Sequence, residues 1–141
     1  MSRVLGVDLG GRRIGIAASD PSGVLASPVG VVERRGDQAA EHREILDMAA
    51  GIGATTVVVG LPLSLDGSHG PAAAAVLEEV AVLAELARPA GVEIDTYDER
   101  FSTVTAEHGL REAKIGRKKR RDRIDAAAAT VILQAWLEAH R

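Results

Sequence analysis

The sequence predicts an α/β fold with a mixed five-stranded sheet, in which an antiparallel meander is followed by parallel strands, with helices on both faces. Two observations predict it. Between residues 3 and 33, three apolar segments are separated only by short turns. From residue 37 onward, amphipathic helical segments alternate with short apolar runs. A meander followed by such an alternation is typical of a mixed sheet covered by helices.

The meander accounts for the first three strands. Residues 3–9 form the first strand, and the glycine pair Gly10-Gly11 supplies a tight turn. A second strand is expected over 12–19. The Pro-Ser-Gly segment at 21–23 is a second turn, and a third strand follows at about 25–33. Turns this short join neighbouring antiparallel strands.

The alternation accounts for the rest of the chain. Residues 37–51 have apolar side chains at helical spacing, interrupted by charges, so they predict a helix. Residues 55–59 are short, apolar and β-branched, as in a buried parallel strand. Pro71 suits the first turn of a helix over 71–88. Residues 92–97 predict the last strand.

Two more helices are expected near the C-terminus. Ser102 or Thr103 can cap a helix that ends near Ala113, and the last helix is expected over 123–139. Residues 114–122 between them are polar and basic, so we expect a loop there. The complete order is βββαβαβαα, without an internal repeat. A length of 141 residues fits one domain, 1–141.

Composition excludes several classes of protein. The chain has no cysteine, which rules out disulfides, thiolate metal sites and cysteine nucleophiles, and fits a reducing compartment. The start of the chain has no signal-peptide layout, and no apolar run approaches the length of a membrane span. With only three aromatic residues, the core must be aliphatic, and binding of single strands by base stacking is disfavoured.

The charge distribution points towards nucleic acid. The net charge of −3 alone would argue against such a partner. However, five consecutive basic residues occupy positions 117–121, so the remainder of the chain carries −8. A concentrated basic segment on an acidic body can neutralise several backbone phosphates. A solvated loop is the alternative, but the position just before Asp125 favours a functional role. The candidate nucleic-acid contacts are Arg12, Arg13, Arg117, Lys118, Lys119, Arg120 and Arg121.

Three acidic residues are the candidate chemical site. Asp8 ends the first strand, Glu99 follows the last strand, and Asp125 lies near the start of the last helix. In open α/β sheets, sites form beyond the carboxyl ends of the strands. Three carboxylates at one point repel each other unless a cation neutralises them, and oxygen ligands suit Mg²⁺ or Mn²⁺. We therefore expect Asp8, Glu99 and Asp125 to be metal ligands and catalytic residues.

Each of these acids also has a structural interpretation. A single carboxylate near a strand end is more often a cap or a solvated turn residue. Asp98 and Asp122 compete for the same roles, and we expect Asp122 to be the N-cap of the last helix. The loop over 60–71 precedes a helix N-terminus, where it could bind a phosphate or serve only as a connection.

The sequence resembles the YqgF/RuvX nucleases, relatives of the RuvC resolvases. Four segments match the motifs of that family in the same order: 6–20, 60–71, 98–103 and 124–128. Ser64 stands where the family more often has Asn, which leaves the role of the 60–71 loop open. Ser102 stands where Thr is common, and neither departure affects the three carboxylates. The resemblance spans almost the whole chain.

The resemblance implies a single RNase H-like nuclease domain with a two-metal site at Asp8, Glu99 and Asp125. It implies a bacterial, cytoplasmic hydrolase that either processes the 5′ end of pre-16S rRNA in ribosome biogenesis or resolves Holliday junctions. Symmetric cutting of a four-way junction would favour a homodimer, because two cuts need two sites. The alternatives are a non-catalytic RNA-binding factor for ribosome assembly and an actin-like ATPase fragment, for whose two-domain cleft the chain is short.

Overall fold

The computed structural model describes residues 3–62, 69–99 and 117–140. They form one five-stranded sheet with three α-helices and a short 3₁₀ helix. The elements in chain order are β1 (Arg3–Leu9), β2 (Arg13–Ser19), β3 (Ala26–Glu33), α1 (Gln38–Gly51), β4 (Ala54–Leu61), α2 (Pro71–Ala87), η1 (Arg88–Ala90), β5 (Glu93–Asp98) and α4 (Arg117–Ala139).

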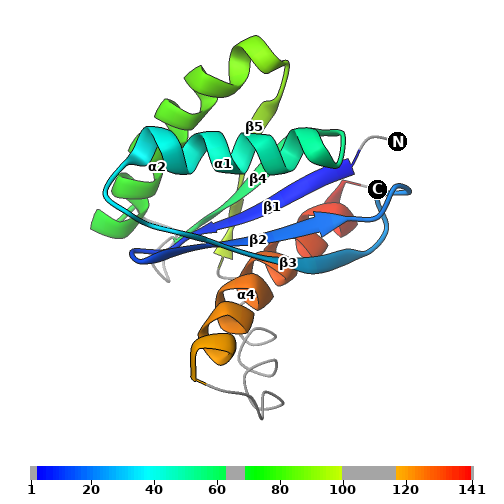
Figure 1. Cartoon of the computed structure of the whole chain (residues 1–141). Coiled ribbons are helices and arrows are strands. Elements are labelled where there is room, and N and C mark those ends of the chain that lie inside the picture. Colours follow the sequence, from blue (N-terminus) through cyan, green and yellow to red (C-terminus); the bar gives the residue numbers. More distant parts are fainter. Residues whose placement is uncertain (1–2, 63–68, 100–116, 141) are drawn as a thin grey trace.

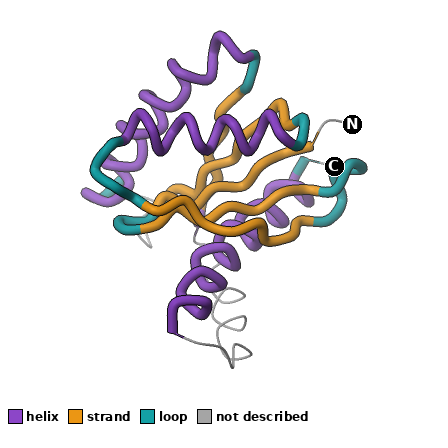
Figure 2. The backbone as a smooth tube through the Cα atoms, viewed as in Figure 1, coloured by secondary structure: helices purple, strands orange, loops and turns teal. Residues whose placement is uncertain are grey.

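The sheet has the strand order β3-β2-β1-β4-β5 and the predicted mixed character (Figures 1 and 2). β1, β2 and β3 pair antiparallel, with Asp8 opposite Gly15. β4 pairs parallel with β1, and β5 pairs parallel with β4, where Leu61 lies opposite Asp98. The carboxyl ends of β1, β4 and β5 therefore meet at one edge of the sheet.

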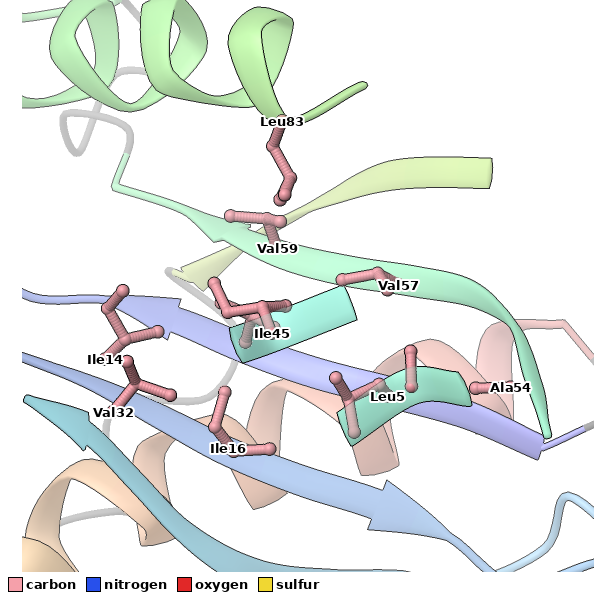
Figure 3. Packing of buried hydrophobic residues seen from close by; sticks show 11 residues of the cluster. Leu5, Ile14, Ile16, Val32, Ile45, Ala54, Val57, Val59 and Leu83 are labelled. Atoms are coloured by element: carbon pink, nitrogen blue, oxygen red, sulfur yellow. The ribbon is translucent and has the colours of Figure 1, made fainter. Parts of the chain in front are cut away.

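Helices cover both faces of the sheet, as the sequence predicts (Figure 1). α1 and α2 lie on one face, where Ile45 and Leu83 point toward the strands (Figure 3). Alternate strand residues complete this aliphatic core: Leu5, Val7, Ile14, Ile16, Val32, Val57 and Val59. α4 covers the other face through a second cluster of Val4, Ala17, Val58, Ala129, Ile132, Leu133 and Leu137.

Close approach of α4 to β1 depends on a glycine. A Cβ at Gly6 would lie 2.7 Å from Cβ of Leu133 and 3.0 Å from the carbonyl oxygen of Ala129. A larger residue would push the helix away from the sheet, because a packed core has no room to absorb such an overlap. Gly6 therefore fixes how closely α4 crosses the face onto which Val4, Gly6 and Asp8 project.

The structure corrects the predicted start of the last helix. α4 begins at Arg117 rather than near residue 123, so the basic segment 117–121 is helical and not a loop. Lys and Arg have good helix propensity, and the run holds no residue that would interrupt a helix. Asp122 is consequently inside α4 and is not its N-cap. The helix expected to end near Ala113 lies outside the described residues.

Two smaller observations complete the fold. Asp37 caps α1 by accepting a hydrogen bond from the backbone N–H of Ala40 at 3.1 Å. Pro71 occupies the first turn of α2, as predicted. In the part of the chain that the structure describes, none of the helices combines the length and apolar character needed to cross a membrane.

Candidate active site

Asp8 and Glu99 come together at the carboxyl edge of the sheet. Their side chains share a hydrogen bond, although β4 lies between the strands that carry them. Gly60 of β4 makes this possible, because a Cβ there would lie 2.6 Å from Oε1 of Glu99 and 2.9 Å from its Cγ. Glu99 thus lies across the bare backbone of β4 and reaches Asp8.

The two carboxyl groups share a proton at neutral pH. Burial raises the pKa of Asp8, and the hydrogen bond with Glu99 partly offsets that rise. The pKa of Glu99 rises to about 8, first because of burial and then because of the charge and hydrogen bond of Asp8 and the charge of Asp98. Glu99 is therefore the protonated donor and Asp8 the acceptor.

Such a pair suits a divalent cation. Asp8 and Glu99 are two half-buried carboxyl groups held together by one proton. A hard divalent cation could displace that proton and bind the carboxylate oxygens instead. Among the described residues, no group of three acidic or histidine side chains is close enough to hold a metal ion. A complete site would need a further ligand, and the side chain of the predicted third ligand, Asp125, lies outside the described part of the chain.

The position of Asp125 follows from the course of α4. Trp136 donates a hydrogen bond to Asp95 at 2.8 Å, whereas Ile132 packs at Gly60, nearer the carboxyl edge. α4 therefore runs antiparallel to β4 and β5, and its earlier residues lie toward the edge that carries Asp8 and Glu99. Asp125 is one helical turn before Ala129, the residue whose carbonyl oxygen packs against Gly6.

The predicted nucleic-acid contacts differ in their surroundings. Arg12 is exposed in the turn between β1 and β2. Arg13 is mostly buried and donates a hydrogen bond from Nε to Glu33 at 3.3 Å. The residues 117–121 form the first turns of α4. Arg12 is thus exposed in the turn that follows Asp8, while Arg13 is engaged within the sheet.

Sequence reasoning missed two residues beside this site. In the sequence, Gly60 indicates only the end of a strand, and its role in clearing space for Glu99 depends on a neighbouring strand. Arg34, in the connection after β3, donates a hydrogen bond from Nε to the carbonyl oxygen of Gly10, next to the Asp8 strand end. Arg34 also donates to Glu79 of α2, a residue so distant in the sequence that no local pattern indicates the pair. The arginine pair Arg34-Arg35 before Gly36 was the only signal in the sequence.

The fold defines a class of protein. Thermus thermophilus RuvC, solved in complex with a Holliday junction substrate, superposes with a TM-score of 0.59 at 18% identity over 99% of this chain and 96% of that one. The yeast mitochondrial Holliday junction resolvase superposes with a TM-score of 0.58 at 11% identity over 96% and 78% of the two chains. The protein therefore has the RNase H-like fold of RuvC.

The particular family follows from sequence comparison. The model of the family described as "RuvX: Holliday junction resolvase" matches residues 2–139, and the chain belongs to this RuvX (YqgF) family. A Streptomyces coelicolor relative named "Putative pre-16S rRNA nuclease" is 48% identical over 139 residues, covering 99% of this chain and 81% of the relative. A Myxococcus xanthus relative of the same name is 43% identical, with 99% and 89% covered.

Proposed function

We propose that this protein is a divalent-metal-dependent endonuclease that hydrolyses phosphodiester bonds in the 5′ region of pre-16S rRNA. The observation that carries the proposal is the hydrogen-bonded pair of Asp8 and Glu99 at the carboxyl ends of β1 and β5. A buried acid pair is costly for folding, and such perturbed groups concentrate at functional sites.

Asp8, Glu99 and Asp125 would hold Mg²⁺ or Mn²⁺. When bound, such ions activate water and stabilise the leaving oxygen of a phosphodiester. Asp8 and Glu99 would bind the ion as carboxylates, with the cation replacing the proton of their hydrogen bond. Asp125 is the proposed third ligand, because the earlier residues of α4 lie toward the acidic edge and position 125 is one turn before Ala129, which packs at Gly6.

Binding of the nucleic acid would depend on basic residues at two places. Arg12 is exposed in the turn that follows Asp8. The basic segment 117–121 begins the helix that also carries Asp125. Contacts between these residues and backbone phosphates would be salt-sensitive and would carry little sequence preference.

Two other functions remain as alternatives. The description of the family supports resolution of branched DNA, which would need two copies of the site for symmetric cutting. A non-catalytic RNA-binding factor in ribosome assembly would use the basic residues alone. That alternative predicts RNA binding without a metal requirement and an Asp8→Asn variant that keeps full function.

A cleavage panel separates these functions. Purified protein is incubated with a pre-16S rRNA 5′ fragment, a four-way DNA junction and linear controls, each with Mg²⁺, Mn²⁺ or EDTA. We expect metal-dependent cleavage of the rRNA fragment and its loss in Asp8→Asn. The matched control is Asp47→Asn, an exposed aspartate of α1. Equal cleavage by wild type and Asp8→Asn would overturn the assignment of the site, and preferential junction cleavage would favour the resolvase.

A further inference from the structure

Arg34 stabilises the turn between β1 and β2 through hydrogen bonds. Within this turn, the backbone N–H of Gly10 donates to the carbonyl oxygen of Asp8 at 3.0 Å. Arg34 contacts the turn twice: its Nε donates to the carbonyl oxygen of Gly10 and its backbone N–H to that of Arg12, both at 3.0 Å. A continuous chain of hydrogen bonds therefore runs from the Arg34 guanidinium to the backbone of Asp8.

The guanidinium of Arg34 is itself anchored to the two helices on the opposite face. It donates to both carboxylate oxygens of Glu79 in α2, at 2.7 and 2.9 Å, and to Glu41 in α1 at 3.3 Å. His42 of α1 shares the Glu79 carboxylate through Nε2 at 2.8 Å. This anchor network, defined as Arg34, Glu41, His42 and Glu79, ties both helices to the turn.

The anchor network is largely shielded from water. The side chains of Arg34 and Glu79 are 18% and 11% exposed, and His42 is completely buried. Buried charges are tolerated only when their geometry is good and their remaining hydrogen bonds are satisfied. Arg34 satisfies this condition because its two terminal nitrogens donate to Glu79 while its Nε donates to the carbonyl oxygen of Gly10. A lysine has a single charged nitrogen and cannot do both.

We propose that Arg34 is a positioning residue for the acidic site: its guanidinium fixes the β1–β2 turn and thereby holds Asp8 and Arg12 in place. The inference rests on the proposed function, since Asp8 is the proposed ligand and Arg12 the proposed phosphate contact. The turn has no room for a side chain at position 10, because a Cβ at Gly10 would lie 2.4 Å from the carbonyl oxygen of Arg13. Groups that orient metal ligands commonly change metal affinity when they are replaced.

The first test uses Arg34→Lys, which keeps the charge but removes the fork. The matched control is Arg88→Lys, in an exposed pair with Glu85. Hydrogen exchange of the Gly10 amide, measured by NMR in metal-free protein, reports on the turn directly. We expect that amide to exchange roughly tenfold faster in Arg34→Lys. Titration with Mn²⁺ should show an affinity lower by roughly tenfold. Arg88→Lys should match wild type in both measurements.

The second test approaches the network from α2. Glu79→Gln removes the charge that holds the guanidinium, and Glu85→Gln is its control on the same helix. We expect Glu79→Gln to accelerate Gly10 exchange and weaken Mn²⁺ binding as Arg34→Lys does, at temperatures well below unfolding. If both variants only lower the melting temperature while Gly10 exchange and Mn²⁺ affinity stay at wild-type values, the network is structural and the proposal is wrong.

The two proposals can fail separately. Absence of Mn²⁺ binding by the wild-type protein would contradict the metal-dependent function. The exchange rate of the Gly10 amide needs no metal, so it still decides whether Arg34 positions the turn.

Discussion

Glu99 reaches Asp8 only because residue 60 lacks a side chain. A Cβ at Gly60 would lie 2.6 Å from Oε1 of Glu99 and 2.5 Å from Cδ1 of Ile132. The absence of a Cβ at Gly60 therefore makes room both for Glu99, which completes the acidic pair, and for Ile132 of α4, which packs over β4. This relationship makes Gly60 the most informative position at which to disturb the site.

Replacing Gly60 with alanine should damage both stability and function. The added methyl group must displace Glu99 or Ile132, and overpacking of this kind costs about 1–3 kcal/mol. Urea unfolding should show that destabilisation, and Mn²⁺ affinity should fall because Glu99 is displaced. The control is Gly51→Ala, at the end of α1, where a Cβ meets nothing within 4 Å. A Gly60→Ala protein with wild-type stability and metal affinity would show that Glu99 has another route to Asp8.

The stability of the metal-free protein should fall as the pH rises. The pKa of Glu99 is raised from 4.5 to about 8, so its contribution is fully present below pH 4.5 and is lost as the pH rises through 8. Because the group is partly exposed, we expect a loss on the order of 1 kcal/mol between pH 5 and 9. The difference between wild type and Glu99→Gln, measured by urea unfolding across this range, isolates the effect. Glu44→Gln, an exposed α1 variant, should track wild type.

Adding Mn²⁺ should reverse that loss of stability. A cation in the place of the shared proton removes the repulsion between Asp8 and Glu99, so binding should release a proton and tighten between pH 6 and pH 8. At a free concentration of about 100 times Kd, the ion should stabilise the fold by about 2.7 kcal/mol. Calorimetry in two buffers of different ionisation enthalpy counts the protons released. A melting temperature that Mn²⁺ raises equally in wild type and Asp8→Asn would place the ion elsewhere.

The Glu79 carboxylate should make the protein sensitive to acid. Burial raises its pKa, but hydrogen bonds from His42 and Arg34 outweigh burial and hold the pKa at about 2. A lowered pKa stabilises the fold above the ordinary value of 4.5, and this stabilisation is lost as the pH falls through about 2. Glu79→Gln should be less stable by about 1.5–3 kcal/mol at pH 7 and show a flatter acid transition. Equal acid transitions in both proteins would contradict this account.

Neutralising the basic segment 117–121 should weaken RNA binding without removing the acidic pair. Removal of one phosphate-binding cation should reduce the slope of log K against log salt by about 0.7 for single strands. Fluorescence anisotropy with a pre-16S rRNA fragment between 50 and 300 mM salt gives that slope. Asp8→Asn serves as the comparison, since it should abolish cleavage and leave the slope unchanged. An unaltered slope after neutralisation would show that residues 117–121 do not contact the phosphates of the RNA.

The sequence predicted the fold well because its signals were local. Short turns indicated the meander, and the change from alternating to helical spacing indicated the crossovers. The placement of Asp8 and Glu99 at one edge was also predictable, since parallel strands bring their carboxyl ends together. Their contact was not, because β4 separates their strands and only the missing side chain of Gly60 lets Glu99 reach across it. The start of α4 was not, because a run of Lys and Arg is compatible with both a loop and a helix.

The network behind the site could not be predicted from the sequence. Glu41, His42 and Glu79 are polar residues within helices, and such residues ordinarily face solvent. Their burial depends on a guanidinium supplied by the connection after β3. Only the three-dimensional arrangement shows that Arg34 is the shared partner.

The alternation along β1 has one more consequence. Leu5 and Val7 enter the core beneath α1 and α2, whereas Val4, Gly6 and Asp8 project toward α4. Inserting or deleting a single residue within this strand would exchange the two sets, turning a carboxylate into the aliphatic layer and a leucine onto the acidic edge. Burial of Leu5 and Val7 in the core thus determines that the Asp8 carboxylate projects toward α4. Such a frame change should abolish folding and not merely displace Asp8, so the acidic pair cannot shift along the chain independently of the core.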